Sequence, residues 1–91
     1  MTNPKLASVK AGIGFIGTGA VGSNLALAFY KKGHAISGLT SRSLVSAVAL
    51  QSLIPGSTVY ESYQDVVDVS SLVFLTVPDD AIENVTESIN W

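Results

Sequence analysis

Short apolar runs recur along the chain between longer, partly polar segments. Each run is brief and bounded by glycine, proline or polar residues, as expected for strands of a sheet that is covered on both faces. Residues 71–77 form the strongest of them, and their continuous apolar character predicts a central strand. The predicted strands are residues 13–16, 35–39, 58–60 and 71–77.

The intervening segments carry apolar residues at helical spacing. In residues 20–32, for example, Val21, Leu25 and Ala28 recur along one face, which predicts a buried helix. Gly33 follows that segment and favours a left-handed helix cap. The other helices are expected at residues 44–50, at residues 63–67, and after a capping box formed by Asp80 and Glu83, where Ile82, Val85 and Ile89 share a face.

Strands and helices therefore alternate from residue 13 onwards. This order predicts an α/β domain with a parallel sheet and flanking helices, built by crossover connections. Residues 1–10 are expected to form a loose lead-in. A doubly wound domain normally continues beyond a fourth strand. We therefore interpret residues 1–91 as one domain that holds the first half of such a fold and is a piece of a longer protein.

Composition narrows the classes of partner. The 91 residues are 47% hydrophobic and 13% charged, with a net charge of −2. Such a chain can build one core and offers no basic field for nucleic acid. It contains no cysteine, which excludes disulfides and thiolate chemistry and favours a cytoplasmic location. No stretch approaches the roughly 18 apolar residues of a membrane span, so no membrane partner is expected.

A glycine pattern lies between the first predicted strand and the first predicted helix. This position is the context in which G-x-G-x-x-G binds a dinucleotide. The first glycine permits the tight turn, the second lets pyrophosphate approach the backbone, and the third lets the helix pack on the strand. The residues are Gly17, Thr18, Gly19, Ala20, Val21 and Gly22.

Free N–H groups at the start of the helix are expected to bind the phosphates, with Ser23 as a further hydroxyl donor. The alternative is a tight turn that binds nothing. A P-loop is excluded because no Gly-Lys-Ser/Thr follows the turn.

The end of the second predicted strand indicates which dinucleotide is bound. Enzymes that prefer NAD place an acid about 20 residues beyond the glycine turn. This chain instead carries Thr40, Ser41, Arg42 and Ser43 there. A guanidinium and hydroxyls suit the 2′-phosphate of NADP, which a carboxylate would repel, so NADP is favoured over NAD. An ordinary helix N-cap with a solvated arginine is the alternative, and both roles can hold together.

The glycine turn, the Thr40–Ser43 segment and residues 72–82 together resemble the N-terminal domain of an uncharacterised Rossmann-like oxidoreductase family. That family is related to NADP-dependent pyrroline-5-carboxylate reductases, deazaflavin-dependent NADP reductases and 6-phosphogluconate or 3-hydroxyacid dehydrogenases. The resemblance implies an NADP-dependent oxidoreductase or dehydrogenase of unknown substrate.

By the same resemblance, Val77, Pro78 and Asp79 contact the cofactor beside the nicotinamide ribose. Strand termination by Pro78 and helix capping by Asp79 and Asp80 are the alternatives. Relatives carry a C-terminal helical domain that contributes substrate contacts and often a dimer interface, and this chain has none. The fragment alone is therefore not expected to turn over substrate, whereas the full-length protein would bind a small molecule and could form a homo-oligomer.

Catalytic residues stay unassigned. The single histidine, His34, begins the second strand, at the opposite edge of the sheet from the expected crevice. No metal site is expected, because the carboxylates lack a second His or any Cys. A non-catalytic nucleotide-binding domain with a regulatory or interaction role is the second interpretation.

Overall fold

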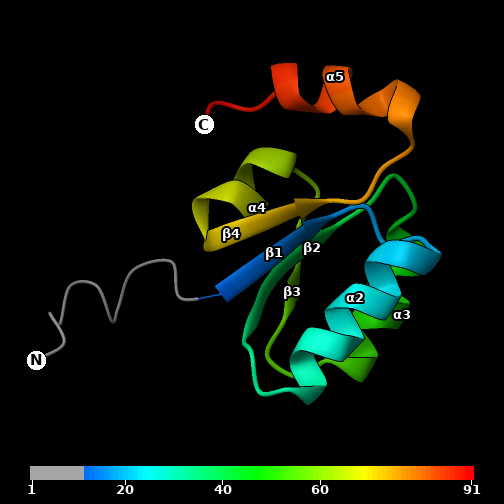
Figure 1. Cartoon of the computed structure of the whole chain (residues 1–91), viewed down its shortest axis with the longest axis vertical. Coiled ribbons are helices and arrows are strands. Elements are labelled where there is room, and N and C mark those ends of the chain that lie inside the picture. Colours follow the sequence, from blue (N-terminus) through cyan, green and yellow to red (C-terminus); the bar gives the residue numbers. More distant parts are fainter. Residues whose placement is uncertain (1–11) are drawn as a thin grey trace, which may run out of the picture.

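The computed structural model describes residues 12–91, and Figure 1 shows their course. The lead-in expected at residues 1–10 lies outside this range. Strands and helices alternate along the described chain, as the hydrophobic pattern predicts. In order they are β1 (Gly12–Ile16), α2 (Ala20–Lys31), β2 (Ile36–Thr40), α3 (Leu44–Leu53), β3 (Thr58–Val59), α4 (Tyr63–Asp68), β4 (Ser70–Leu75) and α5 (Asp79–Glu87).

The strands form one sheet in the order β3-β2-β1-β4. All three pairings are parallel. At the carboxyl end of β1, Ile16 lies opposite Thr40 of β2 on one side and Leu75 of β4 on the other. The expected α/β class is thus confirmed, and three strands end together at one edge of the sheet.

Two apolar clusters cover the two faces of the sheet. Helices α2 and α3 lie together on one face (Figure 1). There Phe15 is fully buried and stacks on Phe74 at a centroid distance of 5.3 Å. Helix α4 covers the other face, where Ile16 and Val66 are fully buried. Alternate residues of β1 therefore point into different clusters, which is why this strand is apolar throughout.

The expected central position of the fourth strand is wrong for the described sheet. β4 lies at its edge, beside β1 alone. Leu72 at the start of the strand is 51% exposed, because α2 and α3 pack against β1 and β2 and do not extend over it. The apolar run reflects the partial burial of the carboxyl half of β4. It does not by itself specify the strand's place in the sheet.

The ends of the helices agree with the sequence in two cases and differ in a third. Gly33, with φ of 93°, takes the left-handed conformation expected after α2. The Ser43 hydroxyl accepts a hydrogen bond from Ser46 N and caps α3. The capping box expected of Asp80 does not form, because α5 begins at Asp79, two residues earlier than such a box requires, and Pro78 is its N-cap. Proline has no side-chain acceptor to cap the helix, and its carbonyl instead accepts a hydrogen bond of 2.8 Å from Ala81 N.

Candidate functional site

The candidate site lies where β1, β2 and β4 end. Gly17 N donates a hydrogen bond of 2.7 Å to Thr40 O, and Thr76 N donates one of 2.9 Å to Ile16 O. The chain leaving β1 is thereby fixed to β2 on one flank and to β4 on the other. In an open parallel sheet this edge is where ligands bind.

Each glycine of the turn between β1 and α2 has its own structural reason. Gly17 has φ of 101°, a conformation that L side chains rarely adopt. At Gly22, which is buried, a Cβ atom would collide with the carbonyl oxygen of Gly17 and with Thr76 Oγ1. Gly19 differs from both, since a Cβ there would have no atom within 4 Å. The space in front of Gly19 is open, as a seat for a ligand requires.

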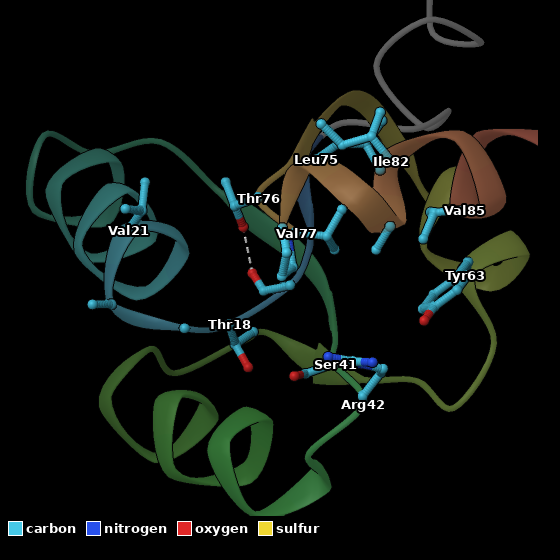
Figure 2. A pocket seen from close by; sticks show the side chains of 15 residues that line it. Thr18, Val21, Ser41, Arg42, Tyr63, Leu75, Thr76, Val77, Ile82 and Val85 are labelled. Atoms are coloured by element: carbon cyan, nitrogen blue, oxygen red, sulfur yellow. Dashed lines mark hydrogen bonds between the residues drawn. The ribbon is translucent and has the colours of Figure 1, made fainter.

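This open space is part of a cleft of about 600 Å³, within the usual range for small-molecule sites. The glycine turn, the end of β2, the end of β4 and one face of α5 line it, and Tyr63 of α4 completes it (Figure 2). Its lining residues are Gly17, Thr18, Gly19, Ala20, Val21, Ser41, Arg42, Tyr63, Leu75, Thr76, Val77, Pro78, Ala81, Ile82 and Val85.

Backbone amides are the polar groups that the turn offers to this cleft. Helix α2 starts at Ala20, so the first N–H groups of the helix have no partner within it. Thr18 is 3% exposed, and its hydroxyl has no hydrogen-bond partner among the described residues. A buried unpaired hydroxyl costs about 1–3 kcal/mol. A ligand oxygen beside Thr18 would remove that cost, so the turn is suited to an anionic group.

The side chain of Ser23 is not available as a further donor to a ligand. Its hydroxyl donates to Thr18 O at 2.9 Å, inside the turn. The expected role of Ser23 as a direct contact is therefore wrong, because its hydrogen is already used by the backbone.

The segment after β2 divides into inward and outward residues. Ser41 and Arg42 line the cleft, on the side opposite α5 (Figure 2). Thr40 is fully buried as the last residue of β2 and does not line it, so its hydroxyl is not placed to read a phosphate. Ser43 is exposed and serves as the N-cap of α3. The alternative of helix capping thus holds for Ser43, while Arg42 remains free to face the cleft.

The loop after β4 supplies the wall across from Arg42. Val77 and Pro78, expected from the resemblance to lie near the cofactor, both line the cleft. The side chain of Asp79 lies outside the described part of the structure. Asp80 is exposed on α5 and is absent from the lining.

Six lining residues were not expected from the sequence. Ile82 and Val85 are expected on the apolar face of the last helix, and Tyr63 at the start of a short helix. Part of that helix face instead borders the cleft. For Thr76 the sequence contains one weak indication of a role in the site, namely that a hydroxyl residue stands near the end of an otherwise apolar strand. The set is Tyr63, Leu75, Thr76, Ala81, Ile82 and Val85.

Residues 12–91 contain neither a metal-binding cluster nor a membrane-spanning helix. No group of three or more His, Cys, Asp or Glu side chains is arranged to hold a metal ion in this range. Of the helices in the same range, none is long and apolar enough to cross a membrane.

Comparison with known proteins places the fold and the cleft in context. The family model described as NADP oxidoreductase, coenzyme F420-dependent, matches residues 12–91. No match was found among curated protein sequences.

Solved structures resemble the chain at low sequence identity. A reductive aminase from Aspergillus terreus, in complex with NADPH and ethyl-5-oxohexanoate, matches with a TM-score of 0.75 and 22% identity, over 89% of this chain and 28% of that one. An imine reductase from Pseudomonas sp. matches with a TM-score of 0.74 and 23% identity, over 89% of this chain and 27% of that one. The chain thus spans about 28% of the length of the reductive aminase. At these identities the likeness establishes the fold.

Proposed function

Because this chain belongs to the family of coenzyme F420-dependent NADP oxidoreductases, we propose that residues 12–91 form the NADP-binding part of an oxidoreductase. The observation that carries the proposal is the turn at Gly19, where open space faces the unpaired amides at the start of α2. The family agrees with the NADP-dependent class expected from the sequence. The reductive aminase of the same fold was solved with NADPH.

The pyrophosphate is proposed to rest on the glycine turn. Amides of Thr18, Gly19 and Ala20 would donate to its oxygens, and the positive end of the α2 dipole would attract its charge. Gly17 and Gly22 shape the turn without touching the ligand.

The 2′-phosphate is proposed to bind at the end of β2. Arg42 would pair with it through the guanidinium, and Ser41 would donate its hydroxyl. Both residues line the cleft. Thr40 and Ser43 leave this set, the first because it is buried and the second because it caps α3.

The opposite wall is proposed to hold the apolar faces of the cofactor and to exclude water. Val77 and Pro78 lie at the end of β4, and Ile82 and Val85 line the cleft from α5. Bound NADPH supplies a hydride, whereas the protein contributes binding and orientation. Groups that would hold a substrate for transfer are proposed to lie outside these residues, in keeping with a piece of a longer, cytoplasmic protein.

Calorimetric titration with NADPH and NADH tests the proposal. We expect NADPH to bind at least tenfold more tightly, because one charge-assisted pair to the 2′-phosphate contributes about 1.5–3 kcal/mol. Absence of binding by either nucleotide would refute the cofactor assignment. Equal affinity for both nucleotides would contradict the proposed contact between Arg42 and the 2′-phosphate, but it would be consistent with pyrophosphate binding at the glycine turn.

A homo-oligomer of the full-length protein stays a prediction. Light scattering of that protein over a range of concentrations measures its mass and decides the question. A monomer at every concentration would contradict the expectation.

A further inference from the structure

Three successive carbonyl groups of the glycine turn each accept a hydrogen bond, one from Thr76 beyond β4 and two from Ser23 in the first turn of α2. Thr76 Oγ1 donates to Gly17 O at 2.6 Å, drawn as the dashed line in Figure 2. Ser23 Oγ donates to Thr18 O at 2.9 Å, and Ser23 N donates to Gly19 O at 2.8 Å. Two hydroxyls and one amide therefore determine which way the three carbonyls point.

The direction of a carbonyl determines the direction of the next amide. In a trans peptide the C=O and the following N–H point to opposite sides. Because these carbonyls are held, the N–H groups of Thr18, Gly19 and Ala20 point away from the groups that donate to the carbonyls. No acceptor for these three N–H groups is found among the described residues. All three residues line the cleft.

The orientation of these amides matters because turning over a single peptide unit would weaken the binding of an anion. Consecutive N–H groups directed to one side form an anion-binding concavity. A flipped peptide would place a carbonyl oxygen, with its partial negative charge, where an amide should meet a phosphate oxygen. Gly17 and Gly19 lack the side chain that would resist such a flip, so their conformation depends on hydrogen bonds.

We propose that the hydroxyls of Thr76 and Ser23 are positioning groups, which keep the carbonyls of the turn out of the anion seat and its amides directed into it. The inference rests on the proposed NADP-binding function. It extends that function to one residue at the end of β4 and one in α2, neither of which need touch the phosphates. Thr76 has the larger role, because its 2.6 Å hydrogen bond joins the first carbonyl of the turn to the end of β4, a different strand.

The fold supplies a matched control for a role in stability alone. Ser71 Oγ donates to Gly12 O at 3.1 Å, so it joins β4 to β1 as Thr76 does, but at the far end of the strands. Loss of this hydrogen bond should lower stability without changing the turn. Ser23→Ala also distinguishes a loss of binding from a loss of stability. Alanine favours a helix, so this variant should not be destabilised through its helix propensity.

The test compares Thr76→Val, Thr76→Ser, Ser23→Ala and Ser71→Ala in the full chain, by calorimetry with NADPH and with inorganic pyrophosphate. We expect Thr76→Val to weaken both ligands about tenfold, Ser23→Ala to weaken both severalfold, and Thr76→Ser to restore wild-type affinity. Ser71→Ala should bind both ligands as wild type does. Amide shifts of Thr18 and Gly19 in ¹⁵N spectra should move in Thr76→Val and Ser23→Ala and not in Ser71→Ala.

The outcomes separate this inference from the function beneath it. If wild type binds neither ligand, the proposed function fails. If wild type binds and Thr76→Val binds equally well with unmoved amide shifts, the positioning role is overturned while the cofactor site stands. Equal losses in Thr76→Val and Ser71→Ala would also overturn it, since stability would then explain both.

Discussion

Gly22 packs directly against the carbonyl oxygen of Gly17, so that a Cβ atom on Gly22 would occupy the same space as that oxygen. The first and third glycines of the turn are therefore one unit. Helix α2 approaches the end of β1 only because Gly22 has no side chain, and the turn at Gly17 takes its course around that contact.

Gly22→Ala should consequently destabilise the fold. Its methyl group would meet backbone at Gly17, which cannot move aside as a flexible side chain can, and would also meet the Thr76 hydroxyl. Overpacking of this kind costs about 1–3 kcal/mol. Urea denaturation followed by circular dichroism measures the loss in the free energy of unfolding. An unchanged midpoint would mean that α2 can shift without cost.

Gly19→Ala is the matched substitution with the opposite expectation. Gly19 has φ of −73° and open space around it, so alanine should be accepted with the same unfolding midpoint. The methyl group would project into the proposed pyrophosphate seat. We expect NADPH affinity to fall at least tenfold in calorimetry, at unchanged stability. Retained affinity would show that no ligand approaches the backbone at Gly19.

Arg42→Ala should change the choice of cofactor rather than the fold. Arg42 is exposed at the end of β2 and lines the cleft, so its removal should leave the unfolding midpoint within the error of measurement. NADPH should lose about 1.5–3 kcal/mol of binding free energy, whereas NADH and pyrophosphate should lose little. Calorimetry at two salt concentrations adds a check, because the NADPH preference should shrink as salt rises. A parallel loss for NADPH and NADH would contradict a 2′-phosphate contact.

The sequence was sufficient for the elements and for one wall of the site. Glycine spacing and apolar periodicity are local properties, so the sequence alone places the turn from Gly17 to Gly22 between a strand and a helix. The family match supports the same class of oxidoreductase that the motifs indicated.

The rest depended on contacts between distant segments. The second strand was expected to end at Leu39, but it continues through Thr40, whose side chain is buried while Ser41 reaches the cleft. One residue of extension reassigns the side chains because successive residues of a strand point to opposite faces. Likewise, helical spacing places Ile82 on the inner face of α5. Only the packing of α5 with α4 in the structure shows that this face also borders a cleft.

The position of α5 yields the last prediction. Gln64 of α4 donates to Asn90 O at 3.1 Å and accepts from Asn90 N at 2.8 Å, so its amide holds the chain just beyond α5 by two hydrogen bonds. Gln64→Glu keeps the acceptor, removes the donor, and places a carboxylate where the amide now donates to Asp68 at 2.9 Å. Repulsion from Asp68 and from the Asn90 carbonyl should release this end of the chain.

We expect the Asn90 amide to exchange with solvent about two- to tenfold faster in Gln64→Glu, the range set by the loss of one net hydrogen bond. NADPH affinity should fall as well, at least twofold and by no more than the factor for exchange, since Ile82 and Val85 would form a less fixed wall. Gln51→Glu is the control, because the Gln51 amide donates to Ser57 O, at the end of α3 away from the cleft. If exchange quickens while affinity is unchanged, the α5 wall contributes nothing to the cofactor site, and binding depends on the glycine turn and Arg42 alone.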